Sequence, residues 1–116
     1  MNKYFLTKYP RKQKALRFFT KSLLANGQKN KIGSIVLFGS LAKGRPSKNS
    51  DIDLAIFIKG KKNRQLEDII DELSFNSTVK YGESIEPLIY SYQEYQKPKS
   101  LFLKEILQYG QNITTS

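Results

Sequence analysis

The sequence lacks both cysteine and histidine. Without cysteine the chain forms no disulfide and offers no thiolate to a metal, and without histidine it has no imidazole ligand and no histidine general base. Any metal in this protein must therefore be held by oxygen atoms, which favours Mg²⁺ or Mn²⁺ over Zn²⁺.

Long apolar runs are absent as well. No run approaches the ~18 residues of a membrane-spanning helix, and the opening residues, MNKYFLTKYPRK, lack the uninterrupted apolar segment of a signal peptide. We therefore expect a cytoplasmic protein without a membrane partner. The length of 116 residues is near the usual size of one domain, so we expect a single domain over residues 1–116.

Acidic residues are missing from the first part of the chain. Residues 1–50 contain twelve lysines and arginines and no acidic residue, whereas residues 51–116 contain eight basic and ten acidic residues. A field of this sign attracts polyanions such as a nucleotide, RNA or an acidic protein surface, although a solvated lysine-rich helix face is the simpler alternative. We rank nucleic-acid binding second, because the aromatic residues do not interleave with the basic ones as a stacking platform requires.

Apolar periodicity predicts alternating helices and strands. We expect a helix over residues 11–26, strands over 34–38 and 51–58, a short helix over 40–43, a helix from Leu66 towards Lys80 with Gly82 as its C-cap, a strand over 84–90 and a helix over 100–109. Pro87 suggests that the third strand lies at an edge, and we expect residues 111–116 to form a frayed tail. The predicted fold class is α/β, with a small mixed β-sheet and helices packed against it.

The most informative stretch covers residues 35–58, IVLFGSLAKGRPSKNSDIDLAIFI. Asp51 and Asp53 begin its second strand and point to one face, where two like charges persist most readily beside a divalent cation. Gly39 and Ser40 follow its first strand, where glycine lets a phosphate approach the backbone and serine adds a donor. The alternative is an N-cap serine followed by a hairpin with two surface aspartates.

Gly39-Ser40, ten residues and then Asp51-Ile52-Asp53 resemble the signature of the nucleotidyltransferase superfamily that includes DNA polymerase beta. The fit is closest to the minimal nucleotidyltransferases, many of which are antitoxins paired with HEPN-domain toxins. This resemblance implies a polymerase beta-like core that transfers AMP from ATP, with Mg²⁺ or Mn²⁺, to a hydroxyl acceptor. The implied acceptor is a tyrosine of a HEPN toxin, whose RNase activity the transfer would block.

The resemblance also implies roles for single residues. Asp51 and Asp53 would be the catalytic metal ligands, and Gly39 and Ser40 would hold the triphosphate of the nucleotide. One metal would bind the triphosphate, and a second would lower the pKa of the attacking hydroxyl.

Further members of the site are expected on neighbouring segments. Glu86 matches the third carboxylate of the family, as a metal ligand or as the base that accepts the proton of the acceptor, although many relatives carry aspartate there. A solvent-facing edge glutamate is the alternative for Glu86, and Glu83 is a second candidate for its role. Lys43 and Arg45 could bind the triphosphate or neutralise the leaving pyrophosphate, or could be solvated loop cations.

Other functions stay open at this point. The fold could act without catalysis, as an antitoxin or nucleotide-binding module that occludes its toxin, or as a basic nucleic-acid-binding protein. A small-molecule hydroxyl is an alternative acceptor. The motif residues contain no base-reading group, so they leave open the base specificity, the acceptor and assembly into homo- or hetero-oligomers.

Overall fold

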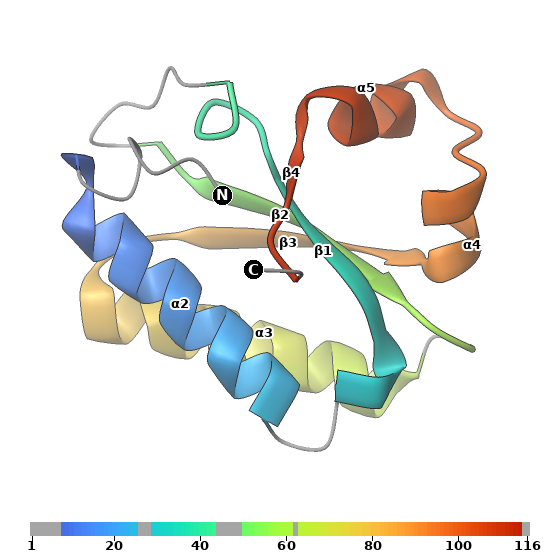
Figure 1. The fold of residues 1–116 in the computed structure, drawn as a ribbon. Coiled ribbons are helices and arrows are strands. Elements are labelled where there is room, and N and C mark those ends of the chain that lie inside the picture. The colour runs from blue at the N-terminus through green and yellow to red at the C-terminus, as the bar shows by residue number, and fades with distance from the viewer. Residues whose placement is uncertain (1–7, 26–28, 44–49, 62, 115–116) are drawn as a thin grey trace.

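The computed structural model describes residues 8–25, 29–43, 50–61 and 63–114. They form a four-stranded sheet in the order β3-β2-β1-β4 with helices on both of its faces (Figure 1). The strands are β1 (Ile32–Phe38), β2 (Ile52–Ile58), β3 (Ile85–Ser91) and β4 (Gln111–Asn112). β1 runs antiparallel to β2 and β4, and β2 runs parallel to β3. The predicted α/β fold with a small mixed sheet is thereby confirmed.

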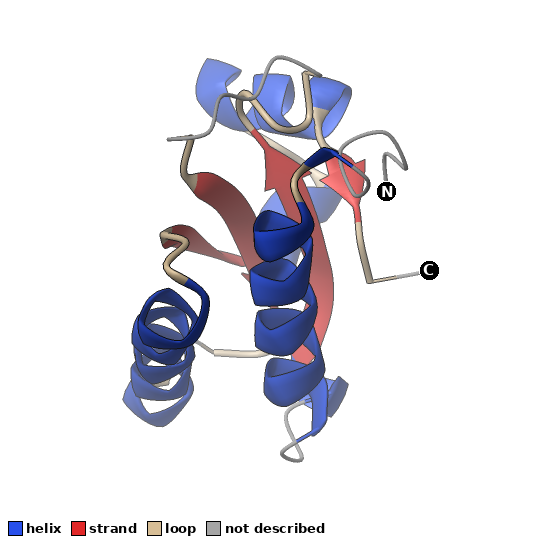
Figure 2. Ribbon diagram, turned by 90° about the vertical axis from the view of Figure 1, so that its left-hand side faces the viewer, coloured by secondary structure: helices blue, strands red, loops and turns tan. Residues whose placement is uncertain are grey.

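Two long helices cover one face of this sheet. α2 (Pro10–Ala25) and α3 (Arg64–Tyr81) lie side by side beneath it in Figure 1, and Figure 2 shows the same layer from the side. Their apolar residues pack against alternate residues of β2, such as Leu54 and Ile56. Alternation with period two sends the intervening residues of the strand to the opposite face.

Two shorter helices cover part of the opposite face. α4 (Tyr92–Gln96) and α5 (Leu101–Tyr109) pack on a smaller cluster that contains Val36, Ala55 and Phe57. On the same face, Glu86 and Leu88 stand beside Asp53 and Ala55 and are exposed. The helices therefore leave the beginning of β2 and β3 open to solvent.

The ends of α3 follow from local sequence. The Asn63 side chain accepts a hydrogen bond from the Leu66 N–H (2.7 Å), and Gly82 ends the helix with a φ of 68° while its N–H donates to the Thr78 carbonyl (2.8 Å). Both the helix and its glycine C-cap agree with the prediction. Ser74, a poor helix former, is tolerated because its hydroxyl donates to the Ile85 carbonyl of β3 (2.7 Å).

Two predicted features at the chain segments beside β1 are wrong. Residues 40–43 form a turn, not a short helix, in which the Lys43 N–H donates to the Gly39 carbonyl (3.1 Å). Gln111 and Asn112, expected in a frayed tail, form β4, and the Ile113 N–H donates to the Ile35 carbonyl (2.9 Å). Backbone pairing with β1 orders this segment although its sequence has no strand pattern.

Two short elements were not predicted. A 3-10 turn, η1 (Lys29–Lys31), leads into β1, and α4 follows β3 directly. The start of α4 carries a capping signal, because the Glu94 side chain accepts from the Ser91 N–H (3.0 Å). Among the helices of the described residues, none is both long and apolar enough to cross a membrane.

A buried ion pair joins α2 to the segment before β3. Lys12 Nζ lies 2.6 Å from Glu83 Oε2, and the two residues are only 2% and 8% exposed. Lys12 also donates to the Ser50 carbonyl, so one ammonium group contacts both the segment before β2 and the segment before β3. Helical spacing places Lys12 on the apolar stripe of α2 with Leu16 and Phe19, and not on a solvated face of the helix.

We expect Lys12→Met to destabilise the fold, because it leaves the Glu83 carboxylate buried without its close partner. Loss of one member of a buried pair costs about 3 kcal/mol, and the exposed Arg11, whose Nε lies 3.8 Å from Glu83 Oε1, compensates little. The double variant Lys12→Met, Glu83→Leu should recover most of that loss, since no buried charge remains. Urea denaturation measures both, and equal stability of the single variant and the wild type would contradict the prediction.

Candidate active site

Three adjacent strands bring two of the predicted site residues, Asp53 and Glu86, into one row with Phe38 across the open sheet face. In the register of the sheet, Phe38 at the end of β1 pairs with Asp53, and Asp53 pairs with Glu86 of β3. Paired positions direct their side chains to the same face. Asp53 therefore lies between the turn that begins at Gly39 and the Glu86 carboxylate.

Gly39 is required here for two reasons. Its φ is 78°, a left-handed conformation that side-chain-bearing residues rarely adopt, and a Cβ built on it would overlap Asp53 Oδ2. The absence of a side chain thus lets the Asp53 carboxylate lie against the backbone of the turn. Ser40, half-buried, follows in the same turn.

Electrostatics connects the three carboxylates. Burial raises the pKa of Asp53 above its ordinary value of 3.8, and the nearby charges of Asp51 and Glu86 raise it further. Asp51 is exposed one residue before β2. The two aspartates and Glu86 therefore concentrate negative charge at one end of the open face, where a cation would be stabilised.

The donor set fits a divalent cation that shares its coordination with phosphate. Within the described parts of the chain, no three carboxylates are close enough to form a complete metal site, and Glu86 Oε1 instead accepts from the Ser84 hydroxyl (3.1 Å). Mg²⁺ is commonly held by one or two carboxylates and by substrate phosphates. Asp51 and Asp53 supply that number of oxygen ligands beside a glycine turn, and the role of Glu86 as a ligand stays a prediction.

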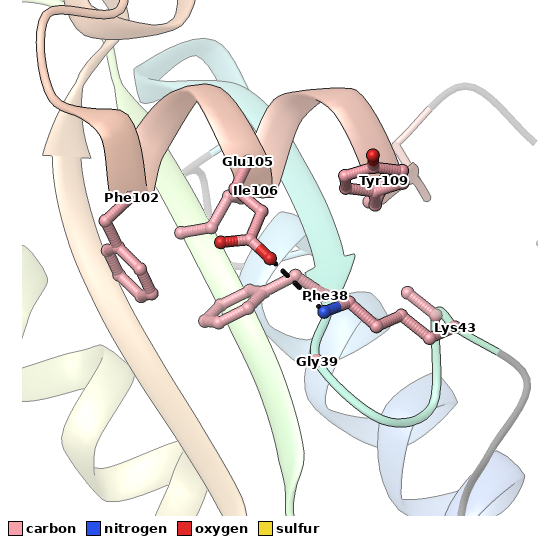
Figure 3. A pocket seen from close by; sticks show the side chains of 9 residues that line it. Phe38, Gly39, Lys43, Phe102, Glu105, Ile106 and Tyr109 are labelled. Atoms are coloured by element: carbon pink, nitrogen blue, oxygen red, sulfur yellow. Dashed lines mark hydrogen bonds and ion pairs between the residues drawn. The ribbon is translucent and has the colours of Figure 1, made fainter.

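Of the two cations predicted to bind the triphosphate, the structure describes Lys43. Lys43 Nζ lies 3.3 Å from Glu105 Oε1 of α5 and 5.9 Å from the centre of the Tyr109 ring (Figure 3). Lys43 thus links the turn after β1 to α5. Arg45, the other predicted cation, lies outside the described residues.

Two residues near the site lie where the sequence did not predict them. Glu83, the alternative to Glu86, is buried against Lys12, whereas Glu86 is one of the two carboxylates that raise the pKa of Asp53. Lys12 was not predicted near the site, and it contacts the carbonyl of the residue before Asp51. Its position on the apolar stripe of α2 was the signal that could have identified it.

Comparison with known proteins identifies the family. The model of the family described as "Polymerase beta, Nucleotidyltransferase" matches residues 21–116. The chain belongs to this family. All seven predicted site residues of this nucleotidyltransferase fall within the matched range, and the observed four-stranded mixed sheet agrees with the core that the family resemblance implied.

Two relatives come from Methanocaldococcus jannaschii, and each is provisionally named a protein adenylyltransferase. One is 29% identical over 85 residues, which cover 73% of this nucleotidyltransferase and 82% of the relative. The other is 31% identical over 75 residues, which cover 63% of this chain and only 47% of the relative. No solved structure matches the chain significantly.

We expect Gly39→Ala to weaken ligand binding by this nucleotidyltransferase more than the backbone strain of the substitution alone explains. A left-handed φ costs an alanine about 1–2 kcal/mol, and the added Cβ must also displace the Asp53 carboxylate. Gly60→Ala is the matched control, since Gly60 has a φ of 73° and its Cβ would meet no described atom within 4 Å. Calorimetric titration with Mg²⁺ and ATP should show weaker binding for Gly39→Ala only, and equal effects of both variants would contradict the prediction.

We expect Asp53→Asn to stabilise the metal-free protein at pH 7. Because the folded pKa of Asp53 is raised, the folded chain retains a proton that the unfolded chain has released, so stability falls as pH rises through the interval between the two values. Removing the charge should therefore raise the urea midpoint at pH 7 and have less effect near pH 4. Asp71→Asn, at an exposed position of α3, is the control and should leave the midpoint nearly unchanged. A lower midpoint for Asp53→Asn at pH 7 would refute the prediction.

Proposed function

We propose that this nucleotidyltransferase transfers AMP from ATP to a hydroxyl group of a protein, with Mg²⁺ or Mn²⁺ as cofactor. The observation that carries the proposal is the position of Asp53, held between the Gly39 turn and Glu86 on the open sheet face. The names of the two relatives support adenylyl transfer to a protein. Family membership supports the reaction class.

The turn after β1 binds the triphosphate in this proposal. Gly39 allows close approach to the backbone, Ser40 adds a hydroxyl donor, and Lys43 and Arg45 supply positive charge where the pyrophosphate leaves. Lys43 would exchange its exposed ion pair with Glu105 for the phosphate. An exposed pair of this kind is worth little on its own, so the exchange is favourable.

The transfer step joins the acceptor oxygen to the α-phosphorus of ATP. The bond between the α-phosphorus and the oxygen that bridges to the β-phosphate breaks, pyrophosphate leaves, and Glu86 accepts the proton of the acceptor hydroxyl. Asp51 and Asp53 would hold the divalent cation, which would supply stabilisation of the negative charge that develops on the phosphate oxygens. Glu86 lies on the β3 side of Asp53, so the acceptor approaches from that side.

We further propose that the acceptor is a tyrosine of a HEPN-domain toxin and that the chain acts as its antitoxin, as a single domain in the cytoplasm. The resemblance of the Gly-Ser and Asp-x-Asp motif to minimal nucleotidyltransferases supports this assignment. The open face beside Glu86 leaves room for a protein acceptor, and the formal net charge of +10 favours a partner with an acidic surface.

ATP labelled at its α-phosphate should transfer its label to a co-encoded HEPN partner in the presence of Mg²⁺, whereas ATP labelled at the γ-phosphate should not. The variant Asp51→Asn, Asp53→Asn should lower the transfer by about a hundredfold or more, because stabilisation by a metal is worth several kcal/mol. The matched control is Asp68→Asn, Asp71→Asn, two exposed aspartates of α3, which should retain full activity. Absence of α-label from every protein would overturn the proposal.

A second function is favoured by the hydrogen bond that the Ser84 hydroxyl, one residue before β3, donates to Glu86, because this bond engages the third carboxylate. In this alternative the chain binds nucleotide and blocks the toxin by occlusion, without transfer. A toxin that remains neutralised by the Asp51→Asn, Asp53→Asn variant would support occlusion. Restored RNase activity with this variant would support transfer.

A further inference from the structure

An apolar slot lies between α5 and the end of β1, beside the candidate active site (Figure 3). Phe102, Ile106 and Tyr109 line it from one face of α5, at the spacing of successive helical turns. Phe38 closes the opposite side, and its ring meets that of Phe102 edge-on with centres 6.1 Å apart. Phe102 and Tyr109 are each 54% exposed, so both rings remain accessible from solvent.

The size and lining of this slot fit a flat aromatic group. Its volume is about 150 Å³, and an apolar cavity of about this volume accepts benzene. The slot continues into a hollow of about 490 Å³ lined by Ala42, Lys43, Glu105 and Tyr109. An apolar end with a few polar groups at its mouth is typical of sites for small ligands.

The slot also shares residues with the turn to which we assign the triphosphate. Gly39 and Lys43 belong to both, and Lys43 lies at the mouth of the slot opposite Glu105. A molecule that places phosphate on the turn can therefore place a connected ring in the slot. A nucleotide has this form, because its ribose joins the ring to the phosphates.

We propose that this α5 slot binds the base of the nucleotide, with Phe102 as a stacking surface. The inference rests on the proposed function and extends it, because the predicted motif residues contain no group that contacts the base. Lys43, at the mouth of the slot, would bind the phosphate. The Glu105 carboxylate would accept a hydrogen bond from the amino group of adenine.

An aromatic side chain of the acceptor fits the slot less well than the base. The acceptor hydroxyl must reach Glu86, which lies on β3, two strands away from Phe38. Neighbouring strands are about 4.8 Å apart, so the two positions are separated by about 10 Å. Asp53 stands between them, and the ring and the acceptor therefore occupy opposite sides of the reacting phosphate.

Calorimetric titration of the full chain with Mg²⁺ and either ATP or inorganic tripolyphosphate tests the proposal. Phe102→Ala should weaken the binding of ATP by about tenfold, as expected for the loss of one base-stacking ring, and leave the binding of tripolyphosphate unchanged. Phe102→Trp should bind ATP as the wild type does. Leu101→Ala and Phe75→Ala are matched controls, because both residues are exposed large apolar residues away from the slot, and neither should change either affinity.

The possible results separate the slot from the proposed function. If Phe102→Ala binds ATP as tightly as the wild type, or if the wild type binds ATP and tripolyphosphate equally well, the slot does not hold the base and the inference is overturned. If the wild type binds neither ligand, the proposed function itself fails, and the inference falls with it. Equal urea midpoints of Phe102→Ala and Leu101→Ala would confirm that the loss of ATP binding is not a loss of folding.

Discussion

The Asp53 carboxylate is held where its own charge is unfavourable, and the rest of the candidate site is arranged around it. It lies against the Gly39 turn, partly out of water, with the charges of Asp51 and Glu86 nearby, and these together raise its pKa. A group of this kind lowers the stability of the folded chain at neutral pH unless a cation or ligand compensates its charge. The carboxylate row is therefore a candidate site on energetic grounds as well as by its motif.

The two faces of the sheet contribute differently to this arrangement. On the closed face, the buried ammonium of Lys12 contacts Glu83 and the Ser50 carbonyl. It thereby links the segments that precede β3 and β2, the strands that carry Glu86 and Asp53. On the open face, the shorter α5 covers only part of the strands and leaves an aromatic slot beside the charged row. An apolar layer on one face of the sheet thus supports a charged row that is exposed in part on the other face.

Local patterns in the sequence were sufficient for the three longer strands and for α2, α3 and α5, but not for the turn over residues 40–43 or for η1, α4 and β4. The strand β2, the helix α3 with its glycine C-cap and the edge position implied by Pro87 were predicted, because each depends on neighbouring residues or on the chemistry of one residue. β4 was missed because its two residues become a strand only through backbone pairing with β1. Burial of Lys12 was missed because its partner, Glu83, is 71 positions away.

By itself the sequence determined the donor chemistry and the spacing of the candidate site. It offers carboxylate oxygens and neither thiolate nor imidazole ligands, and it places a glycine-serine turn ten residues before two carboxylates at the start of a strand. Tertiary structure decided which distant groups meet, because strand register and helix packing depend on contacts across the whole chain. That register sets Glu86 beside Asp53, and that packing brings Phe102 of α5 to Phe38 at the end of β1, where the slot forms.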